Sequence, residues 1–217
     1  MENADGQQDD AEREAEEMLA VLMQRHGASS DDVNEWPKTD GFLLIIGAIS
    51  NESRGGVEAL RGLNILDLGC GSIETSEEES MEDEKRNCEP WIARLLHTAG
   101  AHVVGIDLGD LSKEEFEGHR VDLSRSGALD FLPSSSFDVV HMRNLLDKDA
   151  SSPRLIQKFA INWNSGDMEG MVSREEMEKE IRKQALRLLK DGGVFIYNRT
   201  AYKKIDGSFV PRLTGRE

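Results

Sequence analysis

Hydrophobic positions along this chain follow two patterns: short apolar runs, and longer stretches with one apolar face. The short runs are typical of buried strands and lie at 63–68, 102–107, 118–123, within 136–146, and at 194–199. Between them, residues 89–100 and 173–189 have helical spacing, and Ser173 with Glu176 forms a capping-box signature. Strands that alternate with helices predict an α/β fold with a mostly parallel sheet and right-handed crossovers.

The N-terminal quarter departs from this alternation. Residues 9–26 predict a helix that ends at Gly27, with its apolar face formed by Ala11, Ala15, Met18, Leu19, Leu22 and Met23. This helix is either packed on the domain surface or a lid over a ligand site. Residues 28–40 are expected to form a loop, and the apolar run 41–49 fits a helix or a strand. We therefore divide the chain into an N-terminal helical or lid segment, 1–62, and a sheet domain, 63–217.

Charge is distributed unevenly along the chain. The formal net charge is −16, and residues 1–17 carry eight acidic side chains against one arginine. Residues 74–89 carry eight more against one lysine and one arginine. Such a chain repels phosphate backbones, which argues against nucleic-acid binding and favours a neutral or cationic small molecule, or a basic protein surface. We interpret 74–89 as a mobile insertion, with a gating role as the alternative.

The sequence carries few signals of compartment or metal binding. No apolar run approaches the roughly 20 residues that span a bilayer, so no membrane association is expected. The first residues lack a secretion signal, which predicts a cytoplasmic protein, or alternatively a nuclear one. Cys70 and Cys88 form neither a CxxC motif nor a Cys/His cluster, so we expect no metal site.

The stretch NILDLGCGS, residues 64–72, is the strongest indication of a ligand site. A buried strand ends on Asp67 and leads at once into Gly69-Cys70-Gly71. Glycines at the carboxyl end of a parallel strand let a ligand approach the backbone closely. A dinucleotide fingerprint needs a third glycine where this chain has Glu74, and the lysine of a phosphate-binding P-loop is absent. An oxidoreductase that binds a nicotinamide or flavin dinucleotide is therefore disfavoured.

Three acidic residues at successive strand ends define the expected ligand. Asp67 would face the pocket mouth and accept a hydrogen bond from a cationic amino group. Asp107 ends the second strand and can hold both hydroxyls of a ribose. Asp122 and Leu123 end the third strand and suit the edge and face of an adenine. An adenine, a ribose, an amino-acid end and no phosphate describe S-adenosylmethionine.

At this point the sequence resembles a known family, the class I S-adenosylmethionine-dependent methyltransferases, from about residue 63 to 199. The quoted segments ILDLGCGS, VVGIDL, VDLS, FDVVHMRNLL and ALRLLKDGGVFIYN resemble its motifs in order. The resemblance implies a Rossmann-like sheet with helices on both faces. It also implies cofactor contacts from Asp67, Gly69, Cys70, Gly71, Asp107, Leu108, Asp122, Leu123 and Met142. The segment FDVVHMRNLL is most similar to methyltransferase-like proteins of microbial secondary metabolism.

The sequence also differs from that family in two informative ways. The family's sheet ends with a further helix and two strands, but only residues 200–217 remain here. They contain two strand-like runs around Asp206-Gly207, which predict a shortened C-terminal hairpin. No Asn-Pro-Pro-Tyr-type motif follows the fourth strand, so N-methylation of adenine, cytosine or glutamine is disfavoured.

Methyl transfer to a small molecule is the expected function, with catalytic candidates just after the fourth strand. His141 has a side chain suited to a general base, and Arg143 and Asn144 lie close to it in sequence. His141 can equally be a satisfied core residue. Residues 147–172, with Trp163, are either a substrate-side loop or a plain connection. The alternatives are a non-catalytic S-adenosylmethionine-binding regulatory or scaffold protein and a protein methyltransferase; no oligomeric state is predicted.

Overall fold

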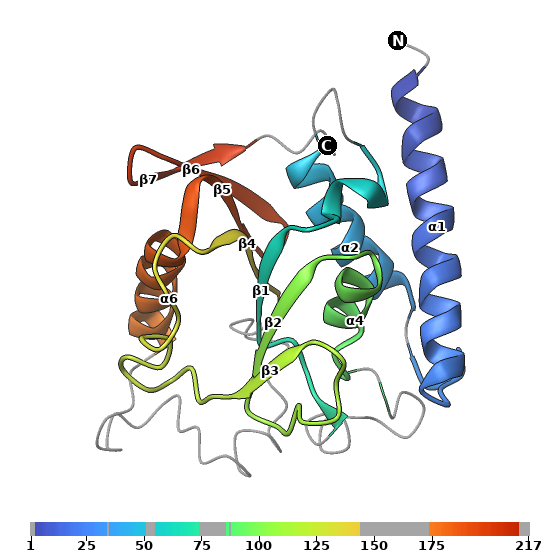
Figure 1. The fold of residues 1–217 in the computed structure, drawn as a ribbon, viewed down its shortest axis with the longest axis horizontal. Coiled ribbons are helices and arrows are strands. Elements are labelled where there is room, and N and C mark those ends of the chain that lie inside the picture. The colour runs from blue at the N-terminus through green and yellow to red at the C-terminus, as the bar shows by residue number, and fades with distance from the viewer. Residues whose placement is uncertain are drawn as a thin grey trace.

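The protein folds around one seven-stranded sheet. The computed structural model describes residues 3–33, 35–50, 55–73, 86, 88–143 and 174–212. The strand order is β3-β2-β1-β4-β5-β6-β7, with β1 Asn64–Leu68, β2 His102–Asp107, β3 Glu117–Arg120, β4 Phe137–Met142, β5 Leu189–Tyr197, β6 Thr200–Ile205 and β7 Ser208–Arg212 (Figure 1). The pairs from β3 to β5 are parallel, and the last two are antiparallel. The predicted α/β architecture with a mostly parallel sheet is confirmed.

Helices cover both faces of this sheet. The helices are α1 Asn3–Arg25, α2 Glu35–Ile49, the 3-10 helix η1 Val57–Leu60, α4 Trp91–Thr98 and α6 Arg174–Leu188. Side chains alternate along each strand, so Ile65 and Val139 pack in one hydrophobic cluster with α1, α2 and α4. Leu66 and Val140 face the opposite way and pack with α6. We call these the α2 face and the α6 face.

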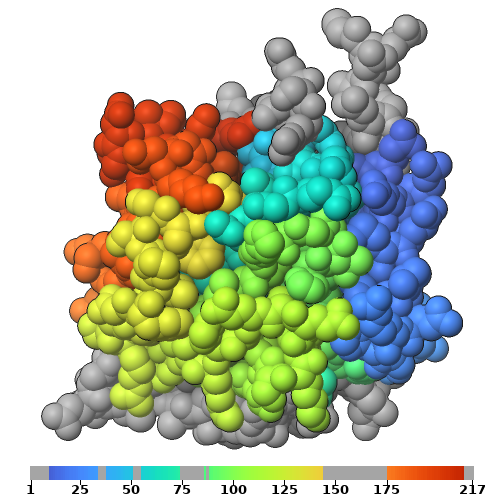
Figure 2. All heavy atoms as spheres, viewed as in Figure 1, coloured from blue at the N-terminus to red at the C-terminus, as the bar shows by residue number. Residues whose placement is uncertain are grey.

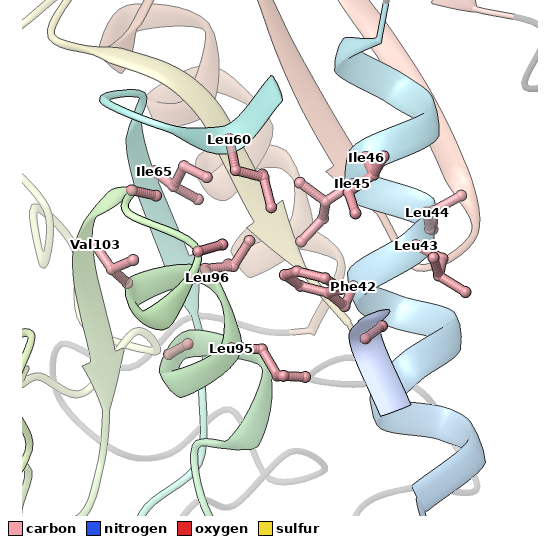
Figure 3. Packing of buried hydrophobic residues seen from close by; sticks show 14 of the residues in the cluster. Phe42, Leu43, Leu44, Ile45, Ile46, Leu60, Ile65, Leu95, Leu96 and Val103 are labelled. Carbon is pink, nitrogen blue, oxygen red and sulfur yellow. The ribbon is translucent and has the colours of Figure 1, made fainter. Parts of the chain in front are cut away.

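The N-terminal helices are part of the main core. Leu19 of α1 is fully buried, as are Phe42 and Ile45 of α2. In Figure 3, Phe42 and Ile45 point from α2 toward Leu96 of α4 and Ile65 of β1. The six apolar residues predicted for one face of the first helix are buried or partly buried in this same cluster. Helix α1 is therefore packed on the domain. It lies along one side of the molecule, and the C-terminal strands lie at the other (Figure 2).

Several element boundaries differ from the sequence-based expectation. The undecided run 41–49 is helical and belongs to α2, which begins at Glu35, so the expected loop 28–40 is shorter than predicted. The apolar residues of α2 meet α1, α4 and the sheet on several sides, which removes the simple helical period. The third strand ends at Arg120, so Asp122 and Leu123 lie in the turn that follows it.

The junction of α6 and β5 also differs. The sequence predicted a helix up to residue 189 and a strand from residue 194, whereas α6 ends at Leu188 and β5 begins at Leu189. Leu189 pairs with Phe137, and the register with β4 then shifts before Val194 pairs with Val139. Gly192 has a φ of 80°, so the glycines form a bulge inside the strand. The predicted capping residue Ser173 lies outside the described residues.

The C-terminal hairpin completes the sheet. Ile205 pairs with Ser208 across Asp206-Gly207, whose φ values of 47° and 71° are those of a tight hairpin turn. A second turn, centred on Asn198 with a φ of 52°, connects β5 directly to β6 without a helix. Strands β6 and β7 of this hairpin are therefore the antiparallel strands at the end of the sheet. The sequence predicted such a hairpin.

Candidate functional site

The glycine loop lies at the point where the strand order reverses. β1 runs between β2 on one side and β4 on the other, and the loop Gly69-Cys70-Gly71 begins directly at its carboxyl end. Gly69 and Gly71 have φ values of 69° and 90°, which only glycine adopts without strain. The amides of Gly69 and Cys70 both donate to the carbonyl of Ile106, at 2.8 and 3.1 Å. This anchors the loop over the neighbouring strand β2.

The close approach that requires glycine at position 71 is made by the chain itself. A Cβ atom on Gly71 would overlap the backbone carbonyl oxygen of Cys88. The sequence-based expectation was that a ligand makes this approach. In the structure the end of the acidic segment folds back onto the loop and occupies that side of Gly71.

Asp107 holds the glycine loop from the end of β2. Its Oδ2 accepts a hydrogen bond from the Gly71 amide at 3.1 Å, and its Oδ1 accepts one from the Gly109 amide at 2.9 Å. The residue is buried, with 9% of its surface exposed. A carboxylate offers about four acceptor positions, so these two amides use part of its capacity. The predicted ribose-binding acid is thus also the residue that fixes the loop's shape.

The predicted adenine contacts, Asp122 and Leu123, have different surroundings. Asp122 Oδ1 accepts from the Ser124 amide at 3.0 Å, and Oδ2 accepts from Arg125 Nε at 3.2 Å, so the carboxylate shapes its own turn. Leu123 is buried in the α6-face cluster. Met142 is also buried in that cluster, whereas Leu108 is half-buried next to Asp107.

Asp67 and His141 form a buried pair in the middle of the sheet. They are register partners on β1 and β4, and their side chains point to the α2 face. His141 Nδ1 lies 2.7 Å from Asp67 Oδ1, and the two side chains are 2% and 3% exposed. Asp67 therefore does not face an open pocket mouth as expected. Among the described residues, His141 Nε2 has no hydrogen-bond partner although it is buried.

Arg143, one residue beyond β4, is bound to helix α2. Its Nη2 lies 3.0 Å from Asp40 Oδ2, and Arg199 in the β5–β6 turn approaches the same oxygen at 3.5 Å. Gly41 has no side chain where the Arg143 guanidinium passes, only 2.7 Å from the position of a Cβ. Asp40 was missed because we expected a loop there, and its partner lies far away in sequence.

A second buried ionic cluster anchors the end of the acidic segment. Arg94 of α4 lies 2.6 Å from Glu89 and 2.7 Å from Glu114, and these side chains are at most 4% exposed. Arg86 pairs with Glu89 and donates from Nη1 to the carbonyl of His26 at 2.6 Å. These contacts anchor the described end of segment 74–89; residues 74–85 and 87, on which the prediction of a mobile insertion depends, lie outside the described residues. Sequence spacing gave no signal of this cluster.

The region around the loop is electronegative. Burial raises the pKa of the Cys70 thiol well above its usual range, and the carboxylates of Asp67 and Asp107 raise that pKa further. Cys70 is therefore a neutral thiol at pH 7 and a poor nucleophile. Two buried carboxylates beside the loop favour a cationic ligand over a phosphate.

The described residues were also compared with the requirements of a metal site and of a membrane span. In the described part of the chain, no group of three or more His, Cys, Asp or Glu side chains is placed to hold a metal ion. None of the described helices combines the length and apolar character that a bilayer crossing requires. Asn144 and the predicted substrate-side segment 147–172, with Trp163, lie outside the described residues.

Comparison with known proteins gives structural neighbours only. No protein-family model matches the chain, and no curated protein matches it in sequence. One similar structure is the selenomethionine-substituted carbon methyltransferase CurJ, with 15% identity and a TM-score of 0.34 over 63% of this chain. Another is the trans-methyltransferase CalH in complex with SAH, with 14% identity and a TM-score of 0.35 over 82% of this chain. The chain spans 29% of the CurJ chain and 41% of the CalH chain, and the likeness concerns the fold alone.

Proposed function

We propose that this protein binds S-adenosylmethionine and transfers its methyl group to a small-molecule acceptor. One observation carries the proposal: the glycine loop lies at the strand-order reversal, and Asp107 at the next strand end holds the loop through the Gly71 amide. In open parallel sheets this is where nucleoside ligands bind. The motif order in the sequence, which places these residues at successive strand ends, supports the same ligand.

The residues at this position suit the chemistry of that ligand. Asp107 would hold the ribose hydroxyls, and Asp122 with Leu123 would lie toward the adenine. The backbone of Gly69, Cys70 and Gly71 would line the amino-acid end, with Leu108 and Met142 beside it. When bound, S-adenosylmethionine supplies an electrophilic methyl group on a positively charged sulfur. The carboxylates of Asp67 and Asp107 suit a cation, and no lysine of a phosphate site accompanies the loop.

His141 and Arg143 have different roles in this proposal. A guanidinium stays protonated and has no acceptor atom, so Arg143 can orient an acceptor but cannot remove its proton. His141 has a ring nitrogen that can accept a proton. The acceptor would therefore approach the carboxyl end of β4 from the side of α2, where both side chains point.

A non-catalytic S-adenosylmethionine-binding protein is the second candidate. The observation that favours it is the burial of His141, since a ring that is 2% exposed can also be purely structural. A protein methyltransferase is supported only by the negative charge, which suits a basic substrate.

Calorimetry tests the cofactor assignment. We expect S-adenosylmethionine to bind with a micromolar dissociation constant and NADH not to bind. Asp107→Asn should weaken binding at least tenfold, about 1.4 kcal/mol, because one carboxylate oxygen is replaced by an amide donor. Asp191→Asn makes the same chemical change on a side chain that is 88% exposed and should leave binding unchanged. Equal affinities for wild type and Asp107→Asn would refute the ribose assignment.

Release of S-adenosylhomocysteine separates an enzyme from a binding protein. The full chain should release it faster in the presence of a suitable acceptor than alone. Binding without any such release across a broad acceptor library would favour the non-catalytic candidate.

A further inference from the structure

Within the described residues, the Asp67–His141 pair leaves one buried nitrogen without a partner. Asp67 as a carboxylate can only accept, so the Nδ1 of His141 must carry the proton in the 2.7 Å hydrogen bond. In the neutral ring, Nε2 then carries a lone pair. Among the described residues nothing donates to this lone pair, and the atom is buried. A buried acceptor without a donor is unfavourable, so this nitrogen needs a physical explanation.

The surroundings keep this nitrogen in an apolar setting. Asp67 is in register with Gly105 on β2 on one side and with His141 on the other, and His141 is in turn in register with Ile196 on β5. The thiol of Cys70 and the ring of Phe116 occupy the space over Gly105. Val139 and Ile196 on the same face belong to the hydrophobic cluster. The two side chains are at most 3% exposed, and the low local dielectric strengthens the electrostatics of the pair.

Other side chains near the loop do not offer the same chemistry. Cys70 is held as a neutral thiol, and both oxygens of Asp107 accept backbone amides. Arg143 has donors only and is paired with Asp40. His119 also lies 2.7 Å from a carboxylate, Glu117, but that pair is on the exposed strand β3.

We propose that His141 Nε2 is the proton acceptor of the reaction and that Asp67 is its positioning residue, so that the methyl acceptor is a weakly acidic O–H or C–H group. This inference rests on the proposed methyltransferase function. The acceptor's proton passes to His141 Nε2, and the electron pair of the broken O–H or C–H bond forms the new bond to the methyl carbon. The electrons of the sulfur–methyl bond remain on sulfur, which becomes a neutral thioether. Asp67 then faces an imidazolium, and its negative charge stabilises that charge.

Nuclear magnetic resonance of the histidine rings tests the dyad without turnover. The full chain has five histidines, and His141→Asn identifies the His141 signals in protein labelled at the ring nitrogens. We expect His141 as the Nδ1–H tautomer in the wild type. In Asp67→Asn the amide N–H donates to Nδ1, so the ring should convert to the Nε2–H tautomer. Glu117→Gln is the matched control on the exposed pair and should leave the His141 signals unchanged.

Adding S-adenosylhomocysteine tests whether the group that donates to His141 Nε2 belongs to the methyl acceptor or to the cofactor. We expect the Nε2 signal to stay in place with S-adenosylhomocysteine alone, because its amino group binds at the glycine loop. A change of this signal to that of a hydrogen-bonded or protonated nitrogen on addition would mean that the cofactor's ammonium group donates to Nε2, which would overturn the proposal. So would an Nε2–H tautomer in the wild type.

Turnover provides an independent test with defined probes. A phenol and a 1,3-diketone carry the proposed acidic group, whereas a pyridine nitrogen has no proton to lose. Asp67→Asn should lower the kcat for the protic probe that the wild type methylates by about 10²- to 10⁴-fold, a larger effect than on the KM for S-adenosylmethionine. Methylation of the pyridine alone, or equal rates for wild type and Asp67→Asn, would overturn the proposal. Calorimetric binding of S-adenosylmethionine, measured on the same proteins, reports separately on the proposed function.

Discussion

At the scale of single residues, glycines are required at different positions for different physical reasons. Gly71 has a φ of 90° and lies against the Cys88 carbonyl, so both backbone conformation and space require glycine. Gly62 has a similar φ of 74°, but nothing lies within 4 Å of where its Cβ would be. Gly41 is helical and makes room for Arg143. Loss of each glycine should therefore have a different cost.

Gly71→Ala should destabilise the fold more than Gly62→Ala. Left-handed backbone costs an L residue about 1 to 2 kcal/mol, which is the expected effect at Gly62. At Gly71 the methyl group also overlaps Cys88, which adds about 1 to 3 kcal/mol. Urea denaturation of both variants measures the difference. Equal midpoints would mean that Cys88 does not lie against Gly71.

At the scale of secondary-structure elements, α4 is attached to its neighbours by charge as well as by apolar packing. Leu95 and Leu96 are fully buried toward the sheet and α2 (Figure 3). Arg94 joins Glu89 before the helix to Glu114 after β2, and its guanidinium lies 4.6 Å from the centre of the Trp91 ring. This cluster fixes the residues that lie against the glycine loop. The stability of α4 and the shape of the loop are therefore coupled.

Arg94→Met should destabilise the protein by about 3 to 5 kcal/mol, because it leaves the buried Glu114 without its cation and Glu89 with Arg86 alone. Binding of S-adenosylmethionine should weaken as well, since Cys88 and Glu89 adjoin the loop. Arg61→Met, which breaks the exposed pair with Glu58, is the control and should change neither property. Thermal denaturation and calorimetry provide both measurements. An Arg94→Met protein as stable as the wild type would show that the cluster contributes no net stability.

At the scale of the whole molecule, the N-terminal helices and the sheet share one hydrophobic cluster. Leu19, Phe42 and Ile45 pack with Ile65 and Val139 of the central strands. Without α1 and α2, one face of the sheet would expose this apolar surface to water. The sequence indicated a boundary at residue 62, but residues on both sides of it belong to the same hydrophobic cluster.

A fragment of residues 63–217 should not fold to a native state. We expect it to lose near-ultraviolet circular dichroism and to bind a hydrophobic dye, because the α2 face of the sheet loses α1 and α2 and keeps only α4. Val21→Ser in the full chain alters an α1 side chain that is 57% exposed and should behave as the wild type. A cooperative thermal transition of the fragment, with native dichroism, would contradict this expectation.

Strand positions and the C-terminal hairpin could be read from the sequence because they depend on local pattern. The segment 102–107 matches β2 at both ends, and Asp206-Gly207 has the φ values that its turn chemistry requires. The run 41–49 could not be assigned because a helix buried on several sides loses its period. The start of β5 was misplaced because pairing of Leu189 with Phe137 extends the strand through two glycines.

The sequence by itself determined the fold class, the glycine loop at the end of β1 and the acidic residue at the end of β2, since each follows from short-range periodicity and backbone chemistry. Only the tertiary structure decided what those residues contact. Asp67 binds His141, Gly71 lies against Cys88, and Asp40 binds Arg143. These partners are brought together by strand pairing and helix packing, which no local pattern encodes.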